Sequence, residues 1–87
     1  MKMGQQLITE KDFRFARYGK EGIAVFYCRE EVAICNFIGD ILHIGRLMDP
    51  EHHEMAAKSV RNITRMMLNG ASFNHAADVV RGVVQCA

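Results

Sequence analysis

Three short runs of β-branched and aromatic residues occupy the middle of the chain. They cover residues 23–28, 32–38 and 41–47. Short apolar runs of this composition, bounded by turn residues, are typical of β-strands. Gly39 and Asp40 separate the last two runs, and a two-residue connection with glycine first is the pattern of a type II′ hairpin turn. With a further turn at the charged residues 29–31, the sequence predicts a three-stranded antiparallel meander.

Residues 49–69 have the periodicity of an amphipathic helix. Asp49 is a good N-cap, Pro50 suits the first helical position, and Gly70 follows the end. Apolar side chains recur every three or four residues, and a charged stripe has the same spacing. The apolar stripe consists of Ala56, Val60, Ile63 and Met67. A long helix with one buried face is therefore expected here.

A last helix is predicted over 72–86. Ser72 is its N-cap, and its apolar stripe consists of Phe73, Ala77, Val80 and Val84. Gly82 lies inside this range, where a glycine costs about 1 kcal/mol relative to alanine. The paired valines near the end make a strand the alternative.

The N-terminal segment is ambiguous between helix and strand. Thr9 is a good N-cap, acidic residues follow it, and Gly19 is a suitable stop, which predicts a short helix over 10–18. Phe13 and Phe15 alternate with Arg14, which is the pattern of a strand. Residues 1–8 are expected to be a flexible tail.

These segments predict a small single α+β domain over residues 9–87, with the element order α-β-β-β-α-α. The chain has 87 residues and is 49% hydrophobic, which is the size and composition of one globular domain. A run of 18 apolar residues, which a membrane-spanning helix requires, is missing from the sequence. The three cysteines are odd in number and widely spaced, so we expect reduced thiols and a cytoplasmic protein.

The predicted pairing sorts the strand residues onto two apolar faces. A sheet face that meets water usually carries polar side chains, so both faces need a cover. The two C-terminal helices can cover one face, but a helix over 10–18 is only about 14 Å long and covers part of the other. The second face is thus expected to bind a partner. Its predicted partner-binding residues are Tyr27, Ile34, Asn36, Ile38 and His43. The alternative is that the N-terminal or last helix buries this face.

Candidate catalytic and metal-binding patterns are weak. His52 and His53 are adjacent on the predicted helix, so they point about 100° apart and cannot both bind one ion from that turn. We expect two exposed histidines in the first helical turn. Cys35 and His43 fall on opposite faces of the predicted sheet, which gives no nucleophile and base pair. The sequence predicts no enzyme activity, no metal and no cofactor.

Nucleic-acid binding is the alternative function. The basic residues that would contact phosphates are Arg14, Arg17, Lys58, Arg61 and Arg65. The net charge is only +1, whereas nucleic-acid-binding domains are usually strongly basic. In the helix over 49–69 the acids come first and the bases last, which the helix dipole favours without any ligand.

We therefore expect a small non-enzymatic protein that binds another protein, or a second copy of itself, stoichiometrically through an apolar sheet face or edge. Such a size suits an accessory, regulatory or inhibitor protein, including the small host-targeting proteins of phages and mobile elements. Membrane association is not expected.

Overall fold

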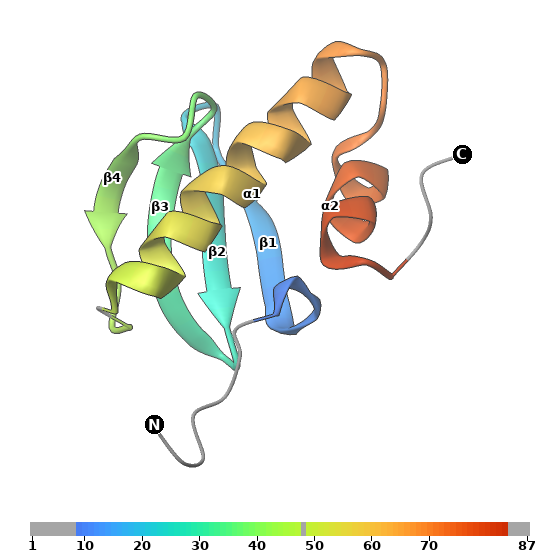
Figure 1. Cartoon of the computed structure of the whole chain (residues 1–87). Helices are drawn as coiled ribbons and strands as arrows, with labels where there is room; N and C mark the ends of the chain where they lie inside the picture. Colours follow the sequence, from blue (N-terminus) through green and yellow to red (C-terminus); the bar gives the residue numbers. More distant parts are fainter. Residues whose placement is uncertain (1–8, 48, 84–87) are drawn as a thin grey trace.

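A four-stranded antiparallel sheet carries the longer of two helices across one face, and the shorter helix lies beside the first strand (Figure 1). The computed structural model describes residues 9–47 and 49–83. The strands follow the order of the chain across the sheet, so each one pairs with the next. Their bounds are Phe13–Tyr18 (β1), Gly22–Tyr27 (β2), Glu30–Asn36 (β3) and Ile41–Ile44 (β4), and the helices are Pro50–Leu68 (α1) and Phe73–Arg81 (α2). The predicted α+β class is thus confirmed, but the sheet has one strand more than expected.

The prediction of a helix over 10–18 is wrong. Thr9 does act as an N-cap, because its hydroxyl accepts a hydrogen bond from the backbone N–H of Lys11 at 3.2 Å. However, the cap begins only a 3-10 turn over Glu10–Asp12, and β1 follows it directly. Alternation of Phe13 and Phe15 with Arg14 gives this strand an apolar side, and β1 pairs with β2 along its whole length. The predicted flexible tail over 1–8 lies outside the described residues.

The register of the β2–β3 hairpin also differs from the prediction. Its turn consists of Cys28 and Arg29, both with positive φ (50° and 72°), so Tyr27 pairs with Glu30. A bulge after Val25 then shifts the register, and Val25 pairs with Ala33 rather than Asn36. When the pairing register shifts by an odd number of residues, side chains of β3 that were expected on one face of the sheet lie on the other face. The sequence did not reveal this turn, because neither residue is a usual choice for positive φ.

The turn between β3 and β4 is wider than the predicted two-residue hairpin. The side-chain oxygen of Asn36 accepts hydrogen bonds from the backbone N–H groups of Ile38 (3.1 Å) and Asp40 (2.9 Å). The backbone of Asn36 also bonds to that of Asp40 and Gly39. Asn36 therefore organises the whole connection, and β4 begins only at Ile41.

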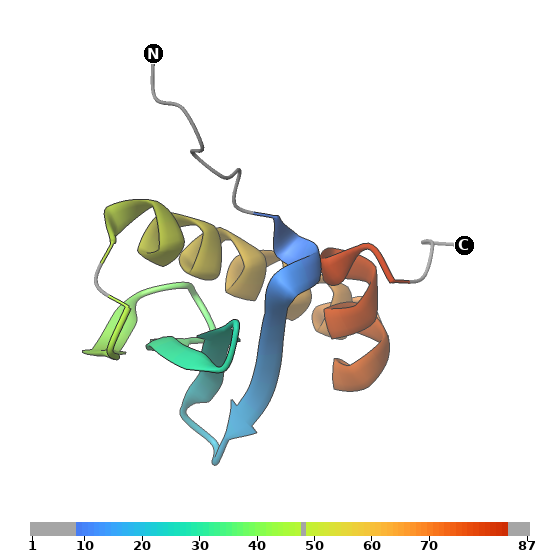
Figure 2. The same ribbon diagram turned by 90° about the horizontal axis from the view of Figure 1, so that it is seen from below.

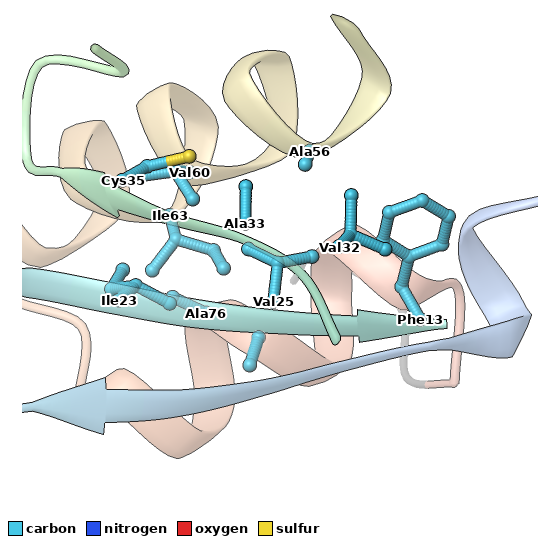
Figure 3. Close-up of a cluster of buried hydrophobic side chains, with 11 residues drawn as sticks. Phe13, Ile23, Val25, Val32, Ala33, Cys35, Ala56, Val60, Ile63 and Ala76 are labelled. Atoms are coloured by element: carbon cyan, nitrogen blue, oxygen red, sulfur yellow. The ribbon is translucent and has the colours of Figure 1, made fainter. Parts of the chain in front are cut away.

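The core lies between the sheet and α1. Ala56, Val60 and Ile63 of α1 are fully buried, as the apolar stripe predicts, and they face side chains from β2 and β3 (Figure 3). On the sheet, the fully buried apolar side chains are Phe13, Ile23, Val25, Val32, Ala33 and Cys35. A Cβ on Gly22 would overlap the backbone carbonyl of Cys35, so β2 and β3 approach each other there too closely for a side chain.

α2 extends the cover beside β1 and ends earlier than predicted. It contacts both α1 and β1. Gly82 adopts a left-handed conformation (φ 77°) as the C-cap, so this glycine terminates the helix and does not lie inside it. The predicted continuation to residue 86 lies beyond the described residues. In Figure 2, α1 lies above the sheet, α2 lies beside β1, and no helix of the described part lies below the sheet.

Candidate interaction face of the sheet

The side of the sheet that the helices leave uncovered is mixed in character. Backbone pairing places on it the side chains that alternate with the core residues of β1, β2 and β3. Phe26 and Ile34 are half-buried on this side, and neither belongs to the apolar core. We call this side the open face, and it consists of Arg14, Ala16, Tyr18, Ala24, Phe26, Ile34 and His43.

A shallow hollow of about 280 Å³ lies on the open face. Ile34 and Leu42 supply apolar surface, and Tyr18 and His43 supply groups that can form hydrogen bonds. The carboxylates of Glu21 and Glu31 also line it. Such a surface suits an apolar side chain with polar or basic neighbours better than it suits an anion.

β4 forms one edge of the sheet. All four of its residues are exposed, and it pairs on one side only, with β3. Ile41, Leu42 and Ile44 are 37%, 52% and 48% exposed, and Ile38 in the preceding turn is 69% exposed. Most of the exposed large apolar side chains of the described residues thus lie in one segment of seven residues. We call Ile38, Ile41, Leu42 and Ile44 the β4 apolar edge.

Two of the five predicted partner-binding residues line the hollow of the open face. Ile34 and His43 pair directly with each other and line the same hollow. Ile38 is strongly exposed, but it lies in the turn before β4. Asn36 is the half-buried last residue of β3, and its amide oxygen accepts hydrogen bonds from the backbone of the following turn. The predicted five-residue face is therefore divided in the structure.

Tyr27 lies on the other side of the sheet, against the core. Its ring packs edge-on against Phe13, with centroids 4.9 Å apart, and against His52 at 4.7 Å. Burial raises the pKa of the Tyr27 hydroxyl above its ordinary value, with smaller contributions from Cys28 and Asp12. The register shift therefore places Tyr27 and Ile34 on opposite sides of the sheet, and the prediction that they share one face is wrong.

The two histidines of α1 are half-buried, not exposed as predicted. His52 packs on Tyr27, and its Nδ1 is 3.5 Å from a carboxylate oxygen of Asp49. The Nε2 of His53 lies 2.8 Å from the backbone carbonyl oxygen of Leu47. Both side chains therefore fix the start of α1 against the sheet and against the segment that leads into the helix. No three potential metal ligands converge among residues 9–47 and 49–83.

The five basic residues of the alternative function do not form one surface. Arg14 belongs to the open face, where its guanidinium donates to the backbone carbonyls of Lys11 and Phe13. Arg17 belongs to the helix side and lies over the ring of Phe73 at 5.9 Å. Lys58, Arg61 and Arg65 are exposed on α1. Three of the five thus share a helix, and the other two lie on opposite sides of β1.

The two cysteines in the described part differ in environment. Cys35 is fully buried, and burial raises the pKa of its thiol to about 11, so it stays protonated at neutral pH. Cys28 is exposed in the β2–β3 turn. The raised pKa of the Cys35 thiol disfavours the reactive thiolate form.

Sequence reasoning missed several residues of the open face and its edge. The sequence places Tyr18 in the predicted helix over 10–18 and Glu31 in a predicted turn, and Glu21 and Leu42 are not among its predicted site residues. The extra residue in the β3–β4 pairing is a bulge, which lets Leu42 and His43 line the same hollow. The apolar character of β4 was the available signal, since an uncovered edge strand rarely carries so many large apolar residues.

None of the helices in the described residues has the length and apolar character needed to cross a membrane. Comparison of the chain with protein-family models, curated proteins and solved structures found no significant match.

Proposed function

We propose that this protein acts without catalysis, by binding another protein molecule through the open face and the β4 apolar edge. The β4 apolar edge carries this proposal. Four large apolar side chains lie within seven residues, at a strand whose outer side is unpaired. Exposed apolar residues scattered singly are normal, but a contiguous group at an open edge is typical of a binding surface.

The chemistry of the adjoining hollow agrees with a protein partner. An added strand would bond to the backbone of β4 and place alternate side chains toward the open face. Ile34 and Leu42 would contact an apolar side chain there, and Glu21 and Glu31 would favour basic neighbours.

The proposal is tested by affinity enrichment from an extract of the source cells, followed by mass spectrometry. Three baits are compared: the wild-type protein, Ile34→Asp, and the control Leu68→Asp. Leu68 is 82% exposed at the end of α1, away from the sheet. Circular dichroism establishes that each bait is folded.

The expected result is a protein enriched by the wild type and by Leu68→Asp but lost with Ile34→Asp, because a buried, unpaired carboxylate opposes association. A partner retained equally by all three folded baits, or no enriched partner and no self-association, contradicts the proposal.

Nucleic-acid binding is the second candidate, and the exposed stripe of Lys58, Arg61 and Arg65 on α1 favours it. It predicts an affinity for DNA or RNA that falls steeply as salt rises, because bound phosphates release counterions. Undetectable binding at low salt, or binding insensitive to salt, contradicts it.

A further inference from the structure

We propose that the occupant of the β4 edge is a second copy of this chain, paired antiparallel with β4 so that one sheet runs through both molecules. This inference rests on the proposed function and names the partner. Three features of β4 support this inference. They are the backbone groups that point away from the sheet, the apolar side chains that would meet in the pairing, and the opposite charges at the two ends of the strand.

The backbone of β4 offers donors and acceptors on its outer side. At one end, the Asp40 carbonyl accepts from the Asn36 N–H (2.8 Å), and at the other the Gly45 N–H donates to Val32 (2.9 Å), so both residues face β3. Neighbouring residues of an antiparallel strand direct their backbone groups to opposite sides. Ile41 and Ile44 therefore direct their N–H and C=O groups away from the sheet. Strict alternation would leave one residue between two outward-facing positions, and the bulge in β4 adds a second one, so Leu42 and His43 both lie between Ile41 and Ile44.

A two-fold axis between two β4 strands uses these groups in pairs. Ile41 of each copy then lies opposite Ile44 of the other, and both positions of the pair form backbone hydrogen bonds. The side chains brought together are 37% and 48% exposed in the single chain. Association would remove this apolar surface from water, which is the main source of stability in such interfaces.

The charges at the two ends of β4 are self-complementary. Asp40 precedes the strand and Arg46 follows it, both are exposed, and neither forms an ion pair within the described residues. In the antiparallel pairing, Asp40 of one copy lies opposite Gly45 of the other. Gly45 has no side chain, so the long side chain of the adjacent Arg46 can reach the carboxylate, and symmetry repeats this contact. A parallel pairing would instead bring like charges together.

The net charge of the whole chain does not oppose this association. It is only +1, so two copies repel each other weakly.

Sedimentation equilibrium of the purified wild-type protein is the first test. We expect a dimer to form as the concentration rises to about 100 µM, as a micromolar Kd requires. A wild-type protein that stays monomeric over this range overturns the self-pairing. The binding of a different protein through Ile34 is measured separately by the enrichment experiment, so the two proposals fail independently.

Variants then test the location. Ile44→Lys should weaken the dimer by at least about tenfold, because it places a charge in the apolar contact between Ile41 and Ile44, which symmetry repeats. Leu68→Lys, which makes the same kind of change at an exposed site on α1, should not change the Kd. A dimer that Ile44→Lys leaves unchanged contradicts pairing through β4.

Charge reversal tests the antiparallel arrangement. Asp40→Arg and Arg46→Asp should each weaken the dimer by about tenfold at low salt, since each turns two attractive contacts into repulsive ones. The double variant restores opposite charges and should recover most of the wild-type affinity. Glu54→Lys on the outer side of α1 is the control. A double variant weaker than both single variants overturns the antiparallel arrangement.

Discussion

Cys28 and Cys35 are seven residues apart but meet opposite environments. Cys28 is exposed in a turn, whereas Cys35 is fully buried between β2, β3 and α1. In a Cys86→Ser background, we expect an alkylating reagent at pH 8 to modify Cys28 in the folded protein and to reach Cys35 only after unfolding. Mass spectrometry of the labelled peptides measures both rates. Equal labelling of the two thiols without denaturant would contradict the burial of Cys35.

Burial of Cys35 also predicts a dependence of stability on pH. Its pKa is raised from 9.0 to about 11 in the folded chain, so above pH 9 the unfolded chain loses this proton first. The free energy of unfolding should therefore fall between pH 9 and pH 11, by an amount on the order of 2 kcal/mol from this group. Urea unfolding of the wild type and of Cys35→Ala, compared at each pH, isolates the contribution. If the free energies of unfolding of the two proteins fall in parallel between pH 9 and pH 11, the contribution of Cys35 is excluded.

Asn36 shows how a single turn positions an element. Its side-chain oxygen accepts two backbone hydrogen bonds that define where β4 begins. Asn36→Ala removes both, so we expect a loss of about 1–3 kcal/mol in the free energy of unfolding and faster amide hydrogen exchange in β4 than in β2. Asn74→Ala, at an exposed position of α2, is a suitable control. Unchanged exchange in β4 would show that the turn does not depend on this side chain.

The helices were predictable from the sequence because their signals are local. Asp49, Pro50 and Ser72 mark their starts, and stripes at helical spacing mark the buried sides of α1 and α2. β1 was less predictable, because Thr9 does cap a helical turn but that turn ends at Asp12. Pairing with β2 then outweighs the local preference of the following residues for a helix.

The candidate site was predictable only in part. Ile34 and His43 were correctly placed on one face, but Tyr27 was not, because two residues with positive φ and a bulge set the register of β2 and β3. Such features depend on the packing of the whole sheet and leave little trace in the residue types. The sequence indicated that one sheet face lacks a cover, and the structure shows which side chains lie there.

At the scale of the whole molecule, the two sides of the sheet have different roles. One side holds the core beneath α1, with Val25 fully buried, and the other carries the half-buried Ile34 without a helix over it. In Figure 2 the described helices lie above the sheet and beside β1, and the lower side is open. The strand-edge pairing and the binding of any other protein both depend on this asymmetry.

The most direct test of this asymmetry is the free energy of unfolding of Ile34→Asp compared with that of Val25→Asp. We predict that Ile34→Asp unfolds cooperatively with a loss of about 1–2 kcal/mol, because its carboxylate stays in contact with water. Val25→Asp should lose more than about 4 kcal/mol or fail to fold, since it buries a charge without a partner. An Ile34→Asp protein as unstable as Val25→Asp would show that the second side of the sheet is also core.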